Sequence, residues 1–414
     1  MKIIINLDNS NRILDMKLKY IVILITLINL FAFNLFAQES NEMDKIKSVI
    51  KELENKYAPD PRTAIFKINI ESGSNNFILK GETNLPEAKE ELLKNLNESN
   101  IIDQIEIFPG RELGKDIYGI ISLSVANLRT HPKNQAEMAS QALLGTPVKI
   151  LKMKKGWSLI QTPDKYISWV ENDQMFRTDY DSLTTWNSSD KIIFIKDFGF
   201  TYSMPDENSE RVTDIVIGDM LKYSGKEKDF YKVTYPDGKI AYVKSYDSKP
   251  FKEWLSKINP TIDNILKTAR SFMGIPYLWG GTSVKGFDCS GFTKTVFFLN
   301  GIILPRDASQ QVNVGEPVDT EDRLENLKPG DLLFFGQKGD SLTKQSITHV
   351  AIYIGDGDYI NAAGKIKINS FSKDKPNYSA YRDDSFVCAK RILSSIGSNG
   401  VVTILNNKFY NGIK

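Results

Sequence analysis

The chain has 414 residues, of which 41% are hydrophobic and 25% are charged, with 53 Lys and Arg against 51 Asp and Glu. This ordinary composition excludes a wholly disordered chain, and the balanced charge leaves no basic excess for binding nucleic acid. Two Cys cannot build a disulfide framework and two His exclude a multi-His metal site, so we expect neither a metal nor another cofactor. At about 150 residues per domain, the length predicts roughly three domains.

Residues 1–37 have the pattern of a secretory signal. Lys17 and Lys19 precede an uncharged apolar run over 21–37, which ends at Ala37. A basic start, an apolar middle and a small final residue are typical of a signal peptide. We therefore predict a signal peptide over 1–37, a periplasmic or secreted protein, and no stable membrane insertion after cleavage. An uncleaved anchor helix is the alternative, although the run is short for a membrane span.

Residues 40–115 alternate between helix and strand patterns. Apolar residues at spacings of three and four predict helices over 43–57 and 85–98. Alternating apolar residues predict strands over 63–71, 75–82 and 101–108. The segment contains no reactive cluster, and we interpret it as a small α+β module for docking or spacing.

The next two segments, 116–180 and 188–250, repeat each other. Gly218 lies 73 residues after Gly145, and YPDGKIAYV at 235–243 repeats TPDKYISWV at 162–170. Short strands and turns within about 60 residues suit a small barrel. The pattern resembles bacterial SH3-type domains, which implies binding or positioning modules. A role in shaping an active-site cleft is the alternative.

The chemistry is expected in residues 258–395. A helix pattern over 261–274 is followed by a Gly-rich stretch and then by Cys289, which directly precedes the helical pattern SGFTKTVFFLNG. A helix N-terminus favours a thiolate, and its free N–H groups could stabilise an oxyanion. Cys388 lies in the strand-like run SFVCAKRIL, so we expect it to be a buried structural thiol.

His349 is the candidate base for this thiol. The other histidine, His131, lies in a polar turn outside the region. His349 opens the alternating run HVAIYIG, and Asn361 lies in the next predicted strand after a short turn. Two adjacent antiparallel strands can bring these side chains together. A polar side chain there can hold the imidazole in one orientation.

The motifs FDCSGF, PYLWGG, LPRDASQQ, LKPGDLLFF and THVAIYIGDGDYINA resemble the NlpC/P60 family of cell-wall cysteine peptidases. The resemblance covers about 258–395 and leaves a tail, 396–414, unassigned. It implies an α+β chain with a papain-like catalytic domain, in which Cys289 is the nucleophile and His349 the base. Asn361 stands where the family commonly has a second His and is expected to be the third catalytic residue. The implied reaction is hydrolysis of the bond between D-glutamate and a diamino acid in peptidoglycan stem peptides, through a thioester.

Two SH3-type barrels ahead of such a domain resemble one branch of the family, which cuts short L-Ala-γ-D-Glu-diamino acid peptides with a free N-terminal amine. This resemblance implies that Tyr277, Asp288 and Ser290 bind the substrate, and that Asp288 faces its ammonium group. Tyr166 is the candidate aromatic from the first barrel, with ordinary barrel surface as the alternative. Arg306 and Gln310 match a motif of the family, and a structural role is expected for both.

Three other functions are compatible with the pattern. They are an N-acetylmuramoyl-L-alanine amidase, a non-catalytic cell-wall-binding protein, and an acyltransferase that uses the same thioester. The sequence does not distinguish diaminopimelate from lysine at the third position of the stem peptide.

Overall fold

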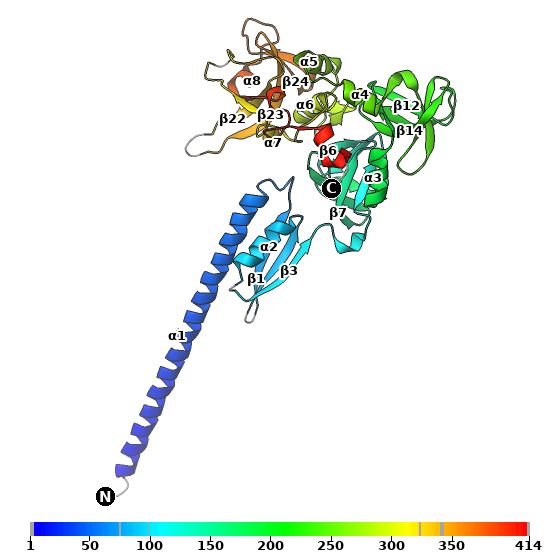
Figure 1. The fold of residues 1–414 in the computed structure, drawn as a ribbon. Helices are drawn as coiled ribbons and strands as arrows, with labels where there is room; N and C mark the ends of the chain where they lie inside the picture. Colours follow the sequence, from blue (N-terminus) through cyan, green and yellow to red (C-terminus); the bar gives the residue numbers. More distant parts are fainter. Residues whose placement is uncertain (1–3, 74–75, 98, 323, 340–342, 412–414) are drawn as a thin grey trace. The chain divides into compact units, whose positions relative to one another are not determined.

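The computed structural model describes residues 4–73, 76–97, 99–322, 324–339 and 343–411. The chain divides into two compact units, Met1–Phe108 and Pro109–Lys414, and each is described by itself (Figure 1).

The first unit is a three-stranded mixed sheet with two helices. Strands β1 (Phe66–Ser72) and β2 (Phe77–Thr83) are antiparallel, and β3 (Ile101–Ile107) runs parallel to β2. Helices α1 (Ile4–Tyr57) and α2 (Pro86–Asn95) share one buried core with the sheet, which includes Leu53 and Leu92. The predicted helices and strands of this module are all present. One difference is that the predicted helix over 43–57 is the last part of a longer helix.

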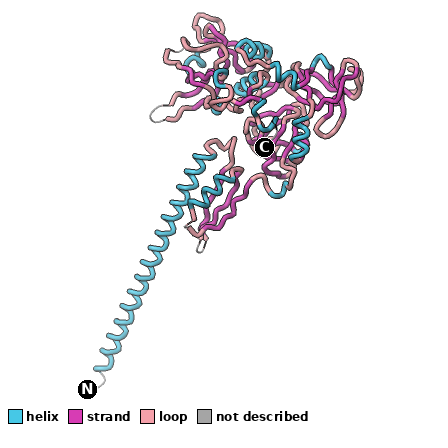
Figure 2. The backbone as a smooth tube through the Cα atoms, viewed as in Figure 1, coloured by secondary structure: helices cyan, strands magenta, loops and turns pink. Residues whose placement is uncertain are grey.

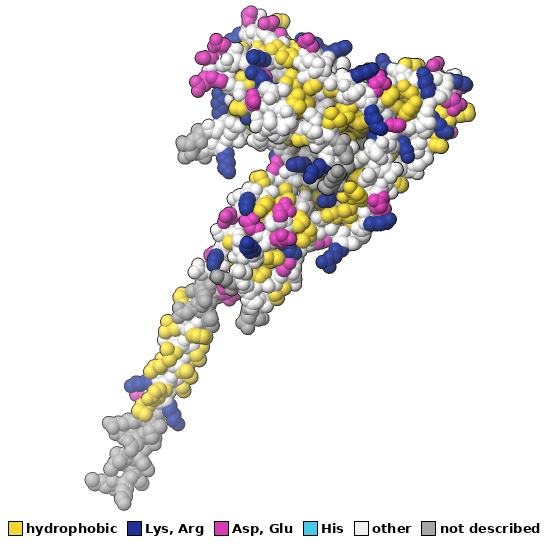
Figure 3. Space-filling view, viewed as in Figure 1, with side chains coloured by type: hydrophobic (Ala, Val, Ile, Leu, Met, Phe, Trp, Pro, Cys, Tyr) yellow, Lys and Arg dark blue, Asp and Glu magenta, His cyan; other side chains and the backbone are white. Residues whose placement is uncertain are grey.

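The apolar run of α1 is exposed to solvent. Large apolar side chains from Leu14 to Phe33, where described, are more than half exposed and form an apolar surface along the helix (Figure 3). Within the described residues, no helix combines the length and the apolarity that crossing a membrane requires. The expected cleavage site at Ala37 lies outside the described side chains. The signal peptide therefore stays a prediction.

The second unit begins with two strand-rich repeats of identical strand order (Figure 2). Every strand of the second repeat starts 73 residues after its counterpart in the first, because both repeats have the same turns at the same spacing. We call them the first and second barrel. The strands of the first barrel, in sheet order, are β10 (Met175–Thr178), β4 (Tyr118–Ile121), β7 (Pro147–Lys154), β8 (Trp157–Gln161), β9 (Ile167–Glu171), β5 (Val125–Arg129) and β6 (Met138–Leu143). Those of the second barrel are β17 (Ser248–Pro250), β11 (Lys191–Phe194), β14 (Met220–Glu227), β15 (Phe230–Thr234), β16 (Ile240–Lys244), β12 (Phe198–Tyr202) and β13 (Arg211–Val216).

The two barrels contact each other through the same turn of the repeat. Gly145 and Gly218 occupy equivalent positions, with φ of 82° and 95°. A Cβ at Gly145 would collide with the carbonyl oxygen of Met220, so glycine allows the close approach. Across this contact the Met220 N–H donates to the carbonyl of Leu144 at 3.0 Å. Helix α3 (Tyr180–Ser188) connects the barrels and buries Trp186 against the first.

The rest of the second unit is a six-stranded antiparallel sheet packed against helices. Its strands, in sheet order, are β21 (Glu316–Val318), β26 (Phe386–Arg391), β22 (Leu332–Gln337), β23 (Ser346–Gly355), β24 (Asp358–Ala363) and β25 (Lys365–Ser370). The helices are α4 (Phe251–Lys257), α5 (Ile262–Ser271), α6 (Cys289–Phe298), α7 (Ala308–Gln311) and α8 (Ala380–Asp384), and short ladders pair β18 (Thr282–Ser283) with β19 (Gly286–Phe287) and β20 (Ile302–Ile303) with β27 (Val402–Thr403).

The sheet has a hydrophobic core on each face. Leu332 and Phe334 of β22 belong to the core around α6, while Leu333 and Phe335 belong to a second core on the other face. A strand buried on both faces is expected to read as a continuous apolar run, which LLFF does. Cys388 of β26 is partly buried and packs on the first core, where burial raises its pKa, in agreement with the expected structural thiol.

The C-terminal tail is ordered against the rest of the second unit. Strand β27 pairs with β20, and Val401 joins the hydrophobic core between α6 and the six-stranded sheet. Farther along, the Asn407 side-chain amide donates to the carbonyl of Pro163 in the first barrel at 2.8 Å. The carbonyl of Phe409, in α9 (Lys408–Asn411), accepts from Asn187 of α3 at 2.8 Å. The tail therefore joins the sheet to the first barrel and to α3.

Candidate active site

Cys289 is the first residue of α6, at the position that the sequence pattern predicted. Asp288 caps the helix, because its Oδ1 accepts the Gly291 N–H at 2.6 Å. A side chain at position 291 would collide with the carbonyl of Gly281, so the glycine after CysSer lets the Gly-rich loop lie directly on the helix. The sulfur is buried where the loop meets the helix.

His349 and Asn361 lie side by side on β23 and β24. The histidine Nε2 is 3.0 Å from Asn361 Oδ1, and the Asn361 amide donates to Asn369 Oδ1 at 3.0 Å. Since the amide oxygen can only accept, Nε2 carries the proton and Nδ1 is the basic nitrogen. The strand order thus provides a fully buried amide that orients the ring.

One pocket of about 330 Å³ brings the cysteine and the histidine together. Burial raises the pKa of Tyr277 in its wall to about 12, so this phenol is a neutral donor at ordinary pH. Three of the predicted site residues line the pocket, and the other lining residues come from β23, β24, α8 and their flanks. The full lining consists of Tyr277, Cys289, Thr348, His349, Ala362, Ala363, Gly364, Tyr381 and Arg382.

The electrostatics of the pocket favour the neutral forms of both Cys289 and His349 before the substrate reacts. Burial, with a further contribution from Asp288, raises the pKa of Cys289 to about 11. Burial and the Arg382 charge lower the pKa of His349 to about 3. These pKa values indicate a thiol and a neutral imidazole at rest rather than the thiolate expected at the helix N-terminus, because desolvation of the sulfur outweighs the hydrogen bonds from the N–H groups of Val350 and Ser290. The thiol proton must move to the imidazole during attack.

The lining of the pocket does not include Asp288 or Ser290, which were predicted to bind the substrate. Arg306, which is 1% exposed, pairs through Nη2 with Asp288 Oδ2 at 2.6 Å and through Nη1 with Ser290 Oγ at 3.0 Å. The guanidinium therefore supplies the positive charge that pairs with Asp288 in this structure. The structural role expected for Arg306 is what its contacts show. Gln310 caps α7 by accepting the Asp307 N–H at 3.0 Å, which is also structural.

Tyr166 is also absent from the pocket lining. It lies just before β9 in the first barrel, is 7% exposed, and its phenol acts electrostatically on Arg306. The ring is buried, so Tyr166 is not exposed barrel surface, and its predicted contact with the substrate stays a prediction. Tyr166 therefore lies near the Asp288–Arg306 pair.

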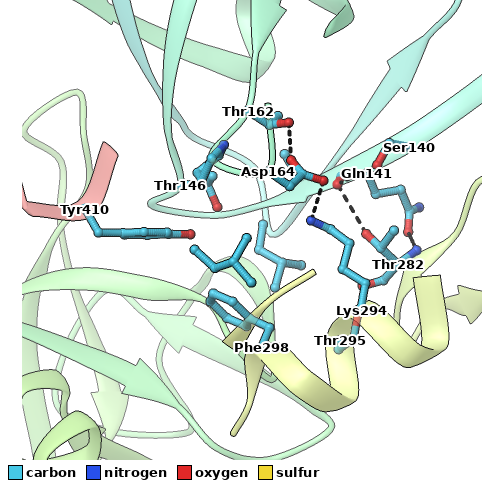
Figure 4. A pocket seen from close by; sticks show the side chains of 14 residues that line it. Ser140, Gln141, Thr146, Thr162, Asp164, Thr282, Lys294, Thr295, Phe298 and Tyr410 are labelled. Carbon is cyan, nitrogen blue, oxygen red and sulfur yellow. Dashed lines mark hydrogen bonds and ion pairs between the residues drawn. The ribbon is translucent and has the colours of Figure 1, made fainter. Parts of the chain in front are cut away.

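The first barrel is fixed against the loop and helix that carry Cys289. Lys294 of α6 pairs with the buried Asp164 of the first barrel at 2.7 Å, and Gln141 Oε1 accepts the Thr282 N–H at 2.9 Å (Figure 4). Figure 4 shows these contacts around a second cavity, of about 70 Å³, with Tyr410 of the tail on its far wall. Trp279 adds a hydrogen bond from its indole to Glu137 at 2.7 Å. A barrel role in shaping the cleft was the alternative drawn from the sequence, but the residues of this interface were not predicted, although Lys294 is a lone charge in an apolar helix.

Thr348, Tyr381 and Arg382 were also missed as pocket residues. Thr348 is adjacent to His349 and could have been inferred from that neighbour. The SAYRDD segment carries no periodic or motif signal. Only the packing of α8 near the end of β24 brings Tyr381 and Arg382 beside a cysteine that lies far away in the sequence.

Comparison with known proteins matches the first barrel and the six-stranded sheet domain of this unit. A family model described as "NlpC/P60 family" matches residues 274–384, and one described as "Bacterial dipeptidyl-peptidase Sh3 domain" matches residues 128–175. The gamma-D-glutamyl-L-lysine dipeptidyl-peptidase of Bacillus cereus is 31% identical over 237 residues, which cover 55% of this chain and 68% of the relative. Dipeptidyl-peptidase 6 of Lysinibacillus sphaericus is 28% identical over 270 residues, covering 63% of this chain and 93% of the relative.

A solved structure agrees with these relatives. The crystal structure of an NlpC/P60 family protein from Bacillus cereus superimposes with a TM-score of 0.55 at 25% identity, covering 66% of this chain and 99% of that one. The similarity therefore extends over most of the second unit and includes the pocket.

Proposed function

Since this chain belongs to the NlpC/P60 family of peptidases, we propose that it hydrolyses the γ-D-glutamyl-L-diamino acid bond of peptidoglycan stem peptides. The observation that carries the proposal is the geometry of one pocket, where Cys289 begins α6 and faces the same space as the His349–Asn361 pair. A buried thiol, a base and an orienting amide are the components of thioester catalysis.

Because Cys289 is a thiol and His349 a neutral imidazole at rest, the first proton transfer accompanies the attack of the sulfur. As the Cys289 sulfur attacks the γ-carbonyl carbon, its proton passes to Nδ1 of His349. The resulting imidazolium then protonates the leaving amine of the diamino acid, and the glutamyl group remains on sulfur as a thioester. His349 next takes a proton from water, whose oxygen attacks the thioester carbonyl. Collapse releases the new carboxylic acid and restores the thiol, so the histidine acts as base and acid in turn.

Short peptides with a free N-terminal L-Ala are the proposed substrates. Two relatives are named dipeptidyl-peptidases, a name that implies release of a dipeptide from an amino terminus. The first barrel is held on the Gly-rich loop and α6 by Glu137, Gln141 and Asp164. A barrel in this position supports a cleft that accepts short chains. Because the Asp288 carboxylate is paired with Arg306, we propose a mainly structural role for it.

The proposed site of action is outside the cytoplasm. The basic residues Lys17 and Lys19 ahead of the apolar run over 21–37 support export by a signal peptide. A substrate in the cell wall is consistent with export.

Mass spectrometry of products from defined peptides tests the proposed reaction. The peptides are L-Ala-γ-D-Glu-L-Lys, its diaminopimelate counterpart, and the N-acetylmuramoyl form of each. We expect L-Ala-γ-D-Glu and the free diamino acid from the free-amine peptides, with Cys289→Ala as the inactive control. Release of an intact stem peptide from the muramoyl form would instead identify an amidase. Absence of any product would favour a non-catalytic wall-binding protein.

A further inference from the structure

Arg382 lies in the wall of the active-site pocket without a role in the mechanism above. It is in the middle of α8, between β25 and β26, and it lines the same pocket as Cys289 and His349. Its charge acts on the pocket, because it lowers the pKa of His349 and interacts electrostatically with Cys289 and Tyr277.

The guanidinium is held by aromatic rings. Its carbon is 5.1 Å from the ring centroid of Tyr381 and 5.6 Å from that of Phe335, and burial lowers the pKa of the half-buried side chain. In the part of the chain that the structure describes, no carboxylate forms an ion pair with Arg382. Two other arginines of the same domain differ in this respect, since Arg306 pairs with Asp288 and Arg391 with Asp331.

A half-buried cation that faces a pocket and lacks an anion indicates a missing partner. Removing a charge from water is unfavourable unless an opposite charge compensates for it. The planar fork of a guanidinium matches a carboxylate with two parallel hydrogen bonds, and stacking on aromatic rings fixes the plane of the fork in advance. The ligand expected here is therefore a carboxylate that enters with the substrate.

We propose that Arg382 binds a carboxylate of the substrate next to the scissile amide. The inference rests on the proposed function, whose substrates carry carboxylates on both sides of that bond. The γ-linkage leaves the α-carboxylate of D-glutamate free. A C-terminal diamino acid has its own α-carboxylate, and diaminopimelate carries a further one on its side chain.

Peptides that lack one carboxylate at a time show which carboxylate of the substrate Arg382 binds. The set consists of L-Ala-γ-D-Glu-L-Lys, the isoglutamine peptide with an α-carboxamide, the peptide amidated at the lysine C-terminus, and the diaminopimelate peptide. The catalytic efficiency, kcat/KM, is measured for the wild type, Arg382→Gln and Arg382→Lys. For the wild type we expect one of the two amidations to lower kcat/KM roughly tenfold to a hundredfold, the usual range for a hydrogen bond to a charged group. A gain of that size for diaminopimelate over lysine would assign the site to the side-chain carboxylate.

The diagnostic result is the selectivity of the variants. Arg382→Gln should cleave the peptide with the recognised carboxylate and the peptide without it at nearly equal rates. Arg382→Lys, which keeps the charge without the planar fork, should show a selectivity between those of Arg382→Gln and the wild type. Arg270→Gln, on the exposed face of α5, is the matched control and should keep the wild-type selectivity. A wild-type enzyme indifferent to every carboxylate would overturn the inference, as would a preference that survives undiminished in Arg382→Gln.

Binding to an inactive enzyme separates this inference from the proposed function. The dissociation constants of the same peptides are measured by calorimetry for Cys289→Ala with and without Arg382→Gln. Carboxylate-dependent binding that Arg382→Gln removes would support the carboxylate site even if the wild type cleaved a different bond. Binding that is the same for all peptides in both proteins would overturn it.

Discussion

At the scale of single residues, the two cysteines differ in what surrounds them. Cys289 opens a helix inside the pocket, whereas Cys388 packs on the core of the sheet. Cys289→Ala should lower turnover more than about a thousandfold with little change in stability, because the methyl group replaces the nucleophile at small loss of volume. Cys388→Ala should keep most of the activity. Peptide hydrolysis and thermal melting measure both effects, and the reverse pattern would contradict the site.

His349 makes stability depend on pH in the acid range. Its folded-state pKa of about 3 lies below the value of about 6.5 for an unperturbed histidine, so the unfolded chain binds the proton more readily. The unfolding free energy should therefore be independent of this group above about pH 6.5 and fall as the pH decreases toward 3, by up to a few kcal/mol. Urea denaturation at several pH values measures the slope.

A matched variant isolates the contribution of His349. In His349→Ala, the unfolding free energy should depend less on pH between about 6.5 and 3 than in the wild type. Substitution of the exposed His131 should leave this pH dependence unchanged. An identical slope in wild type and His349→Ala would show that the ring is not buried in its neutral form.

The Asp288–Arg306 pair should determine stability rather than choice of substrate. Asp288→Asn keeps a good helix-capping side chain but leaves the buried guanidinium without its anion. We expect a loss of about 3–5 kcal/mol in the free energy of unfolding, measured by chemical denaturation. The double variant Asp288→Asn with Arg306→Met should recover part of the loss, since no buried charge remains. An unchanged stability together with a lost preference for free-amine peptides would restore Asp288 as the amine-binding group.

At the scale of elements, the tail is part of the fold of the catalytic unit. Ile404 and Leu405 are neighbours on it, but Ile404 is 1% exposed and Leu405 59% exposed. Ile404→Ala should cost about 2–5 kcal/mol in the free energy of unfolding because it opens a cavity in a packed site. Leu405→Ala should cost less than about 0.5 kcal/mol. Equal effects in denaturation experiments would mean that the tail does not pack as described.

The two barrels have the same strand order but different contacts with the rest of the unit. Both copies keep the glycine in the turn between the third and fourth strands of the repeat in sequence order, and this turn forms the contact between them. Asp164 belongs to the PD turn that recurs in the second copy as Asp237. Only Asp164 meets a lysine of α6 and is buried. The two copies therefore have the same fold, but they differ in what their PD turns contact.

At the scale of the whole molecule, the chain should function without its first unit. All residues of the proposed site belong to Pro109–Lys414, and Met1–Phe108 has a hydrophobic core of its own. A protein beginning at Pro109 should fold and keep kcat/KM within about twofold of the full chain on soluble peptides. Circular dichroism and the peptide assay provide the test. A large loss of activity in a folded fragment would show that the first unit contributes to the site.

Local sequence patterns were enough to predict the secondary-structure elements, the repeat and the placement of Cys289, His349 and Asn361. Periodicity predicted the helices and strands, because the side that each residue buries depends on local geometry. The offset of 73 residues predicted two copies of one strand order, and the structure has them. Cys289 at a helix start and His349 beside Asn361 also followed from local pattern, since a helix end and a strand pair joined by a short turn are short-range features.

The protonation states and the lining of the pocket depend on the packing of elements that lie far apart in the sequence. The pKa of a buried group depends on desolvation by residues from many elements, so the neutral state of Cys289 and His349 could not be read from a helix end. The partner of Asp288 was a motif arginine whose position depends on the packing of the loop before α7. Arg382 reaches the pocket through the placement of a short helix that has no sequence signature. Contacts between distant segments are set by the packing of whole elements, and local pattern carries little information about them.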